Sequence, residues 1–137
     1  MADTQDGPDL HPVTRELASG PDHAAISSLL PDGRIQTHHI WGGVEGDRLY
    51  VNTEPHRQES KDLERDPRVT LALRDAGNPY RYAEVRGRVV GTERGQSARD
   101  QIDQLSQEHD GKPYPPEQIK TERVTVWIEP ERQTIAG

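Results

Sequence analysis

The sequence contains 137 residues, only 30% of them hydrophobic, with a formal net charge of −7 at neutral pH and neither Cys nor Phe. The missing cysteines exclude disulfides, thiolate metal ligands and cysteine nucleophiles, and the acidic balance argues against a nucleic-acid partner, because such proteins usually carry a basic face. We expect a soluble cytoplasmic protein without a membrane partner, since the first residues are polar and no run approaches the length of a membrane span.

The low apolar content bears on assembly. A lone chain of this length and composition would have a thin hydrophobic core. The expected strands are short and regularly spaced, so a second copy that covers one face of them would supply the missing apolar area. We therefore expect a homodimer.

At the N-terminus, residues 1–9 are polar, contain Gly and Pro and show no periodicity. This composition predicts a disordered tail before a single domain over 10–137. A short helix is expected over 13–18, because its apolar residues share one face and Gly20 and Pro21 form a stop signal behind it.

Three strands are expected next, over 23–30, 35–41 and 48–53. The first two flank a turn at 31–34, where Pro fixes the entry and Gly takes positive φ. A second turn is expected at 44–47. Up to this point the pattern indicates an antiparallel meander.

The middle of the chain predicts a short polar helix within 56–69, followed by a strand over 69–73. The longest expected strand covers 80–92, where apolar and charged residues alternate. Gly87 and Gly91 interrupt it and would permit a bend or bulge, as a closing barrel requires.

The last third of the sequence predicts a helix over 97–109, a rigid Pro-rich loop over 111–116 and a closing strand over 123–130. Six strands with two or three helices and no internal repeat place the chain in the mainly β, α+β class. The expected architecture is a six-stranded antiparallel barrel.

One candidate for an anion site lies in the polar helix after the third strand. Arg57 and Lys61 are four residues apart, so they share a helical face, and the first-turn N–H groups beside them lack helical partners. The alternative is a solvated connector in which Glu64, Arg65 and Asp66 face water. Spacing alone favours the connector.

Metal and hydrolase motifs find little support. Of the six histidines, His38 and His39 are adjacent in a strand and point to opposite faces, and no histidine pair has helical ligand spacing, so we expect no metal site. Spacing leaves open a haem held by one histidine. The serines lack a nucleophile-elbow pattern and the glycines lack dinucleotide-binding or P-loop spacing.

Several stretches together resemble a known superfamily. They are the Pro31-Asp32-Gly33 turn, the strand 49–53, the stretch 57–69 that ends in Asp66-Pro67-Arg68-Val69, and the stretch 78–87. Their order and spacing are similar to those of the flavin and deazaflavin oxidoreductases of the pyridoxamine 5'-phosphate oxidase-like split-barrel superfamily. The resemblance covers about residues 20–130 and is greatest to the branch that uses the deazaflavin coenzyme F420.

This resemblance implies a split β-barrel of the FMN-binding type, assembled as a homodimer with two cofactor grooves at the subunit interface. In the family, basic residues at the start of the helix after the third strand hold the coenzyme phosphate. Tyr82 and Trp127 could also line the pocket. The positions that the resemblance assigns to the coenzyme are Gln36, Thr37, His38, Ile40, Val51, Asn52, Thr53, Arg57 and Tyr80, and Lys61 joins them as a candidate because it shares a helical face with Arg57.

The sequence departs from the family pattern at the phosphate site. The pattern has Lys two residues after the Arg and Asn three residues later, where this chain has Glu59 and Asp62. A carboxylate in place of a cation exchanges attraction for repulsion beside a phosphate, and Lys61 could compensate. His39 also stands where a proline is common.

The resulting hypothesis is an F420-dependent oxidoreductase that transfers hydride to an electron-poor small-molecule acceptor. Arg57 and Lys61 would anchor the phosphate, and His38 would be the candidate proton donor if it faces the groove; alternatively His38 is an ordinary strand residue bonded to a neighbour. A second hypothesis is the same barrel with FMN. A third, favoured by Glu59, is a binding module that has lost the redox coenzyme and takes a haem-like or unknown ligand.

Overall fold

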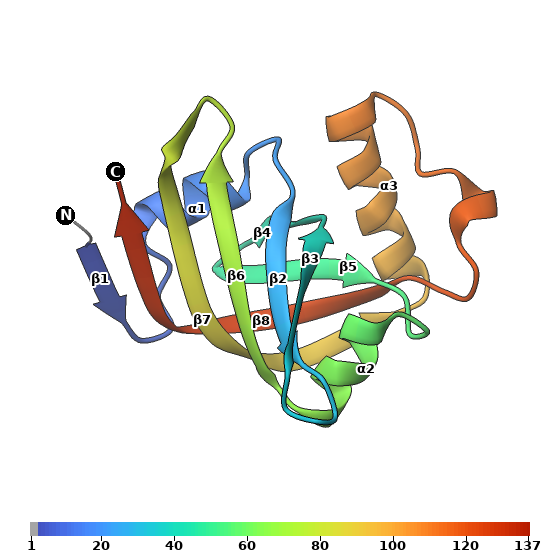
Figure 1. Cartoon of the computed structure of the whole chain (residues 1–137). Coiled ribbons are helices and arrows are strands. Elements are labelled where there is room, and N and C mark those ends of the chain that lie inside the picture. The colour runs from blue at the N-terminus through green and yellow to red at the C-terminus, as the bar shows by residue number, and fades with distance from the viewer. Residues whose placement is uncertain (1–2) are drawn as a thin grey trace.

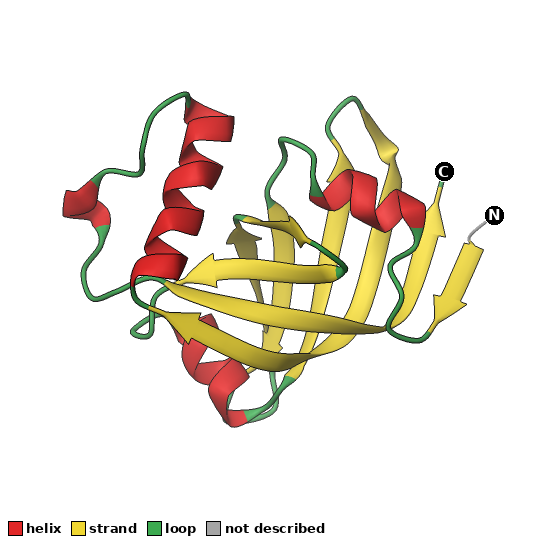
Figure 2. Cartoon of the chain, turned by 180° about the vertical axis from the view of Figure 1, so that it is seen from behind, coloured by secondary structure: helices red, strands yellow, loops and turns green. Residues whose placement is uncertain are grey.

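The computed structural model of the chain describes residues 3–137. One continuous antiparallel sheet curls into a barrel, with α1 and α2 at opposite ends and α3 to one side (Figures 1 and 2). In chain order the elements are β1 (Asp3–Asp6), α1 (Pro12–Ala18), β2 (Ala24–Leu29), β3 (Ile35–Ile40), β4 (Gly42–Glu45), β5 (Arg48–Thr53), α2 (Gln58–Arg65), β6 (Arg68–Asp75), β7 (Asn78–Arg94), α3 (Gln96–Asp110), a 3-10 helix (Pro116–Gln118) and β8 (Val124–Ala136).

The barrel closes through the chain itself. The strand order is β3-β2-β6-β7-β8-β5-β4, so β3 and β4 lie at the two ends of the hydrogen-bonded path. Only Trp41 separates these two strands in sequence, and its carbonyl oxygen accepts a hydrogen bond from the N–H of Asn52 at 3.1 Å. The segment 35–45 therefore pairs first with β2 and then with β5, which joins the two ends of the sheet.

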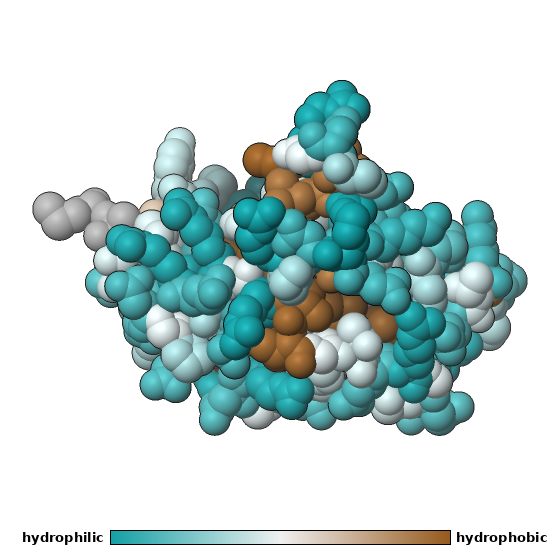
Figure 3. All heavy atoms as spheres, turned by 90° about the horizontal axis from the view of Figure 1, so that it is seen from below, coloured by the Kyte–Doolittle hydropathy of each residue, from teal (hydrophilic) through white to brown (hydrophobic). Residues whose placement is uncertain are grey.

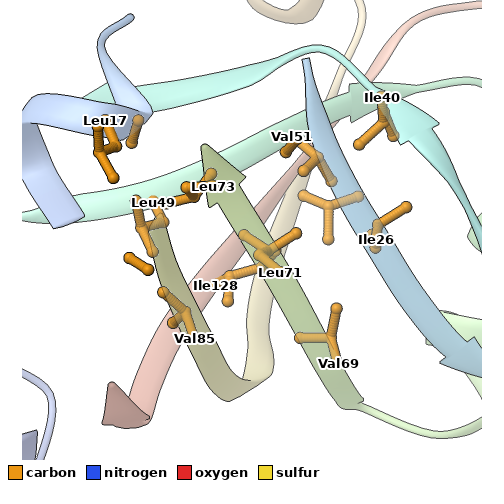
Figure 4. Close-up of a cluster of buried hydrophobic side chains, with 14 of the residues drawn as sticks. Leu17, Ile26, Ile40, Leu49, Val51, Val69, Leu71, Leu73, Val85 and Ile128 are labelled. Carbon is orange, nitrogen blue, oxygen red and sulfur yellow. The ribbon is translucent and has the colours of Figure 1, made fainter. Parts of the chain in front are cut away.

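The main core fills the inside of the barrel with alternate residues of its strands (Figure 4). In β6, buried residues alternate with exposed or half-buried ones, as the period-two sequence pattern predicts. A second cluster forms beneath α3 from Tyr50, Ile102, Leu105 and Trp127. The largest contributors to the main core include Ile26, Leu49, Val51, Leu71, Val85 and Ile128.

The structure has eight strands, so the prediction of six was too low. The predicted tail 1–9 contains β1, which pairs with the distal end of β8 in the register Asp3↔Ile135 to Asp6↔Arg132; residues 1 and 2 lie outside the described part. Four polar residues show no useful alternation, and only the edge of β8 gives their backbone groups partners. The segment 42–45 is β4, so the first half of the turn predicted at 44–47 lies in a strand.

The long bent strand is confirmed in β7, which pairs with both β6 and β8 and shifts register at Arg86/Gly87 and at Val89/Gly91. Gly87 is needed for close approach, because a Cβ there would collide with the carbonyl oxygen of Glu129 and lie 3.3 Å from the Cα of Pro130. At Gly91 an added Cβ would meet nothing within 4 Å. The two glycines of one strand thus differ in their steric role.

This difference predicts unequal effects of the same substitution. Gly87→Ala should lower the free energy of unfolding by about 2–3 kcal/mol, since the backbones of β7 and β8 must separate to admit the methyl group. Gly91→Ala should change it by less than about 0.5 kcal/mol. Urea unfolding of both variants measures this, and equal losses would contradict the assigned role of Gly87.

Candidate functional site

A groove with a volume of about 220 Å³ is lined by the end of β3, the end of β5, α3 and the loop before β8. We call it the Arg57 groove. It combines basic and aromatic side chains that come from all parts of the sequence. Its lining residues are His23, His39, Ile40, Trp41, Asn52, Arg57, Ile102, Tyr114 and Arg123.

The basic side chains of this groove are arranged around the carboxylate of Glu54, which is 1% exposed. One oxygen, Oε1, accepts hydrogen bonds from the backbone N–H groups of Lys120 at 2.9 Å and Thr121 at 3.0 Å. The other, Oε2, lies 3.3 Å from Nη1 of Arg123 and 3.6 Å from Nη2 of Arg57. A single buried carboxylate thus holds two guanidinium groups and a loop.

Arg123 is only 3% exposed and its guanidinium is held on three sides. Besides the contact with Glu54, its Nε donates to Oδ1 of Asn52 at 2.8 Å, and its Nη2 donates to the backbone oxygen of Asn52 at 3.1 Å. The ring of Tyr114 lies beneath it, 5.1 Å from the guanidinium carbon. These contacts fix the cation in one orientation.

The charges in this cluster do not balance, because two guanidinium groups share one carboxylate. Burial, followed by the charge of Arg57, lowers the pKa of Arg123. Burial alone would raise the pKa of Glu54, but the N–H groups of Thr121 and Lys120 and the two arginines outweigh it and hold that pKa below its ordinary value. The positive excess would favour an anionic group in the groove.

An aromatic wall stands next to these cations. The indole of Trp41 lies near-parallel to the imidazoles of His23 at 5.3 Å and His109 at 5.2 Å, which are themselves 6.4 Å apart, and it meets the ring of Tyr114 edge-on at 6.3 Å. Burial and the neighbouring His109 lower the pKa of His23. Nε1 of Trp41 is buried and finds no hydrogen-bond acceptor among residues 3–137.

Glu59, at the position of the family's Lys, does not line the groove. It is 4% exposed, and its Oε1 accepts a hydrogen bond from the hydroxyl of Thr53 at 2.6 Å. Its Oε2 lies 3.3 Å from Nε2 of His38, without the alignment of a hydrogen bond. The carboxylate is therefore held between β3, β5 and α2, and it does not project toward a ligand beside Arg57.

Asp62, at the position of the family's Asn, fastens α2 to the barrel. This fully buried carboxylate accepts hydrogen bonds from Gln58 at 2.8 Å and from Ser28 of β2 at 3.2 Å, and it pairs with Arg65 at 3.3 Å. Both departures from the family pattern thus have internal partners, and neither carboxylate lines the groove.

Of the predicted coenzyme positions, the structure brings Ile40, Asn52 and Arg57 into the groove. The imidazoles that line the groove belong to His23 and His39. The predicted candidate, His38, instead turns its buried Nε2 toward Glu59. The remaining predicted positions lie elsewhere: Val51 in the barrel core, Thr53 on Glu59, Gln36 half-buried on β3, Thr37 exposed and bonded to Ser27, Lys61 exposed on α2, and Tyr80 83% exposed on the β6–β7 hairpin.

The weaker candidates are also placed outside the groove. Tyr82 is 43% exposed, and Trp127 belongs to the cluster beneath α3. Sequence reasoning missed Arg123, Tyr114 and His23, which line the groove together with Arg57. A lone Arg at the start of an expected strand gives no local signal of such a role. Only the fold brings it to Asn52 and Glu54.

Two absences concern the part of the chain that the structure describes. Residues 3–137 contain no group of three or more His, Asp or Glu side chains placed to hold a metal ion. None of the helices described here is long and apolar enough to cross a membrane.

The Glu54 cluster predicts a pH dependence of stability. Because the pKa of Glu54 is lower in the folded protein than its ordinary value of 4.5, its ionised form stabilises the fold above that value, and this contribution is lost as the pH falls through the folded-state pKa. Glu54→Gln should therefore lower the free energy of unfolding by about 3 kcal/mol at pH 7 and flatten its decline in acid.

The matched control is Glu64→Gln, an exposed carboxylate on α2. It should shift the free energy of unfolding by less than about 0.5 kcal/mol. Denaturant unfolding between pH 7 and pH 3 measures both variants. An unchanged acid profile in Glu54→Gln would show that the cluster does not stabilise the fold.

Comparison with known proteins supports the fold. No protein-family model and no curated protein matches the sequence. Among solved structures, the chain is similar to an F420 reductase, with 27% identity, a TM-score of 0.73 and coverage of 87% of this chain and 94% of that one. It is also similar to a putative pyridoxamine 5'-phosphate oxidase from Listeria innocua, with 16% identity, a TM-score of 0.66 and coverage of 88% and 92%.

A third similar structure is a FAD-binding protein from Mesorhizobium loti, with 16% identity, a TM-score of 0.62 and coverage of 100% of this chain and 98% of that one. In all three comparisons the shared architecture spans nearly the whole of both chains. The stretches at 31–33, 49–53, 57–69 and 78–87 predict this split-barrel architecture. The chain therefore has the split-barrel fold of these proteins, and its resemblance to the pyridoxamine 5'-phosphate oxidase-like superfamily and to the F420-dependent branch is confirmed.

Proposed function

We propose that this chain is an oxidoreductase that binds a deazaflavin coenzyme of the F420 type at the Arg57 groove and transfers hydride to an electron-poor small-molecule acceptor. The observation that carries the proposal is the pair of guanidinium groups, Arg57 and Arg123, that shares one buried carboxylate at the start of α2. The resemblance assigns this place to the coenzyme phosphate. The similarity to an F420 reductase supports the same assignment.

The residues present fit the anionic part of such a coenzyme. A groove of about 220 Å³ admits a phosphate and the atoms next to it, and the shortage of negative charge around Arg57 and Arg123 would be relieved by its oxygens. Trp41 and Tyr114 offer aromatic surface beside the cations, and Nε1 of Trp41 is a donor without an acceptor in the described range 3–137. When bound, the deazaflavin or flavin ring supplies the hydride.

The chain's own groups have separate tasks in this proposal. Glu54 orients both guanidinium groups, so the phosphate site is already formed before a ligand arrives. His39 is the imidazole of β3 that lines the groove, and it replaces His38 as the candidate hydrogen-bond or proton donor to a polarised acceptor. His38 keeps a supporting place beside Glu59.

A homodimer remains part of the proposal. Several large hydrophobic side chains are exposed, among them Ile35 at 69% and Tyr80 at 83%. Figure 3 shows hydrophobic surface gathered between polar regions on one face of the molecule. Tyr80 does not line the groove of its own chain, but on a hairpin tip it could reach the groove of a second copy.

The runner-up is the same barrel with FMN, which the similarity to a FAD-binding protein favours. The binding-module alternative loses part of its basis, because the carboxylate of Glu59 is turned toward Thr53 and His38. A fluorescence titration of the purified, dialysed protein with F420 and, in parallel, with FMN separates the three alternatives. Failure of both coenzymes to bind would leave the binding module as the leading hypothesis.

The first variant to titrate is Arg57→Ala. Removing this guanidinium should weaken coenzyme binding about tenfold or more, since a charge-assisted contact with the phosphate is lost. Arg34→Ala is the matched control, because Arg34 lies in the exposed β2–β3 turn and pairs with Asp32. It should leave the affinity unchanged. Equal affinities of Arg57→Ala and the original protein would overturn the assignment of the groove.

A second pair of variants tests the role of Glu59. Restoring the family's residue with Glu59→Lys should not strengthen coenzyme binding, because the side chain at this position is held among Thr53 and His38. It should instead lower the free energy of unfolding by roughly 3 kcal/mol, through an unpaired buried cation. Glu64→Lys makes the same charge change on the exposed side of α2. Tighter binding by Glu59→Lys alone would show that position 59 does face the ligand.

A further inference from the structure

A second, larger cavity lies under α3 and shares no lining residue with the Arg57 groove. We call it the α3 groove. Its volume is about 730 Å³, and its walls come from α3, β4, β5, β7, β8 and the end of α1. Its lining includes two aromatic side chains and four carboxylates: Tyr50, Trp127, Glu45, Glu93, Asp100 and Glu108.

The four carboxylates are not neutralised by any residue within 3–137. None of them forms an ion pair with any residue in the described range 3–137. Three of them accept hydrogen bonds from neutral donors: Glu93 from Trp127 at 3.2 Å, Asp100 from Gln96 at 2.7 Å and Glu108 from Gln104 at 3.3 Å. A groove lined by one sign of charge concentrates ions of the opposite sign.

The aromatic corner already holds one cation of the chain. Tyr50 and Trp127 meet edge-on with their centroids 5.7 Å apart, and the guanidinium carbon of Arg48 lies 4.4 Å from the centroid of the Trp127 ring. Within residues 3–137, Arg48 is the one arginine without a carboxylate oxygen inside 4.0 Å. An aromatic ring face attracts cations in this way.

Two further features agree with a cationic ligand. The end of α1 lines the groove at Ala18, Ser19 and Gly20, where the last helical carbonyls carry the negative end of the helix dipole. Burial, followed by the charges of Glu108 and Glu45, raises the pKa of Tyr50 to about 12. The end of α1 and the carboxylates of the groove therefore both contribute negative potential near the aromatic corner of Tyr50 and Trp127.

The position of the Tyr50 ring in the aromatic corner also depends on the glycines beside it. Gly42 and Gly43 line the groove next to Tyr50, and a Cβ at Gly43 would lie 2.8 Å from the Tyr50 hydroxyl. A side chain at this position would displace the tyrosine ring.

From the unpaired carboxylates, the aromatic corner and the size of the cavity, we propose that the α3 groove binds an organic cation, a protonated or quaternary amine with an aromatic or aliphatic body. The ammonium group would lie among Glu45, Asp100 and Glu108, and the body would pack on Tyr50 and Trp127. This site is independent of the Arg57 groove, which has the opposite charge.

The test uses the full chain and isothermal titration calorimetry with benzyltrimethylammonium as the probe. Benzyl alcohol is the neutral comparison of similar shape. We expect saturable binding of the cation and binding of the alcohol at least about tenfold weaker, since only the cation gains the carboxylate and cation–π contacts. Absence of cation binding up to millimolar concentration, or equal affinity for both probes, would overturn the proposal.

Two double variants separate a specific site from general charge attraction. Asp100→Asn with Glu108→Gln should weaken cation binding about tenfold, by removing two contacts in the groove. Glu64→Gln with Glu117→Gln makes the same change in net charge at exposed positions outside it and should have no effect.

Competition at constant ionic strength completes the design. Tetramethylammonium chloride should displace the probe, and KCl should not. Equal effects of the two double variants, or equal displacement by the two salts, would show that the acidic groove attracts counter-ions without selecting an organic cation. Because the probe contains no phosphate or redox group, this outcome does not depend on whether F420 or FMN binds.

Discussion

The buried carboxylate of Glu54 fixes the arrangement of the Arg57 groove. A carboxylate removed from water is costly unless donors surround it, and here the donors come from the loop before β8, from the start of α2 and from Arg123. Each of these segments must reach one point at the end of β5. The contact that satisfies the buried charge therefore also places the two guanidinium groups that form the proposed phosphate site.

Charge in this protein is organised locally, although the chain as a whole is acidic. Guanidinium groups exceed carboxylates in the Arg57 groove, whereas the α3 groove has carboxylates without a cationic partner among residues 3–137. The net charge of −7 says nothing about either. Glu59 is a second example of this local organisation. Its carboxylate would repel a phosphate, but the side chain contacts Thr53 and His38 and does not line the groove.

Much of the fold follows from local pattern. Alternating apolar and polar residues identify strands such as β6 and β7, and Gly and Pro place the turns between them, because these signals depend on neighbours along the chain. β1 and β4 have no such signal. Their few residues become strands only because a preformed edge of β8 or β5 supplies hydrogen-bond partners.

The sequence by itself determined the resemblance to the split-barrel proteins, the bent barrel strand and the place of Arg57 at the start of α2. Tertiary structure alone decided which side chains meet there. It brought Arg123 to Glu54 across 69 positions of sequence, turned His39 to the groove and His38 toward Glu59, and left Lys61 exposed. The physical reason is that the pattern of a strand shows only that neighbouring side chains point to opposite faces. The packing of distant segments decides which of these faces lines the groove.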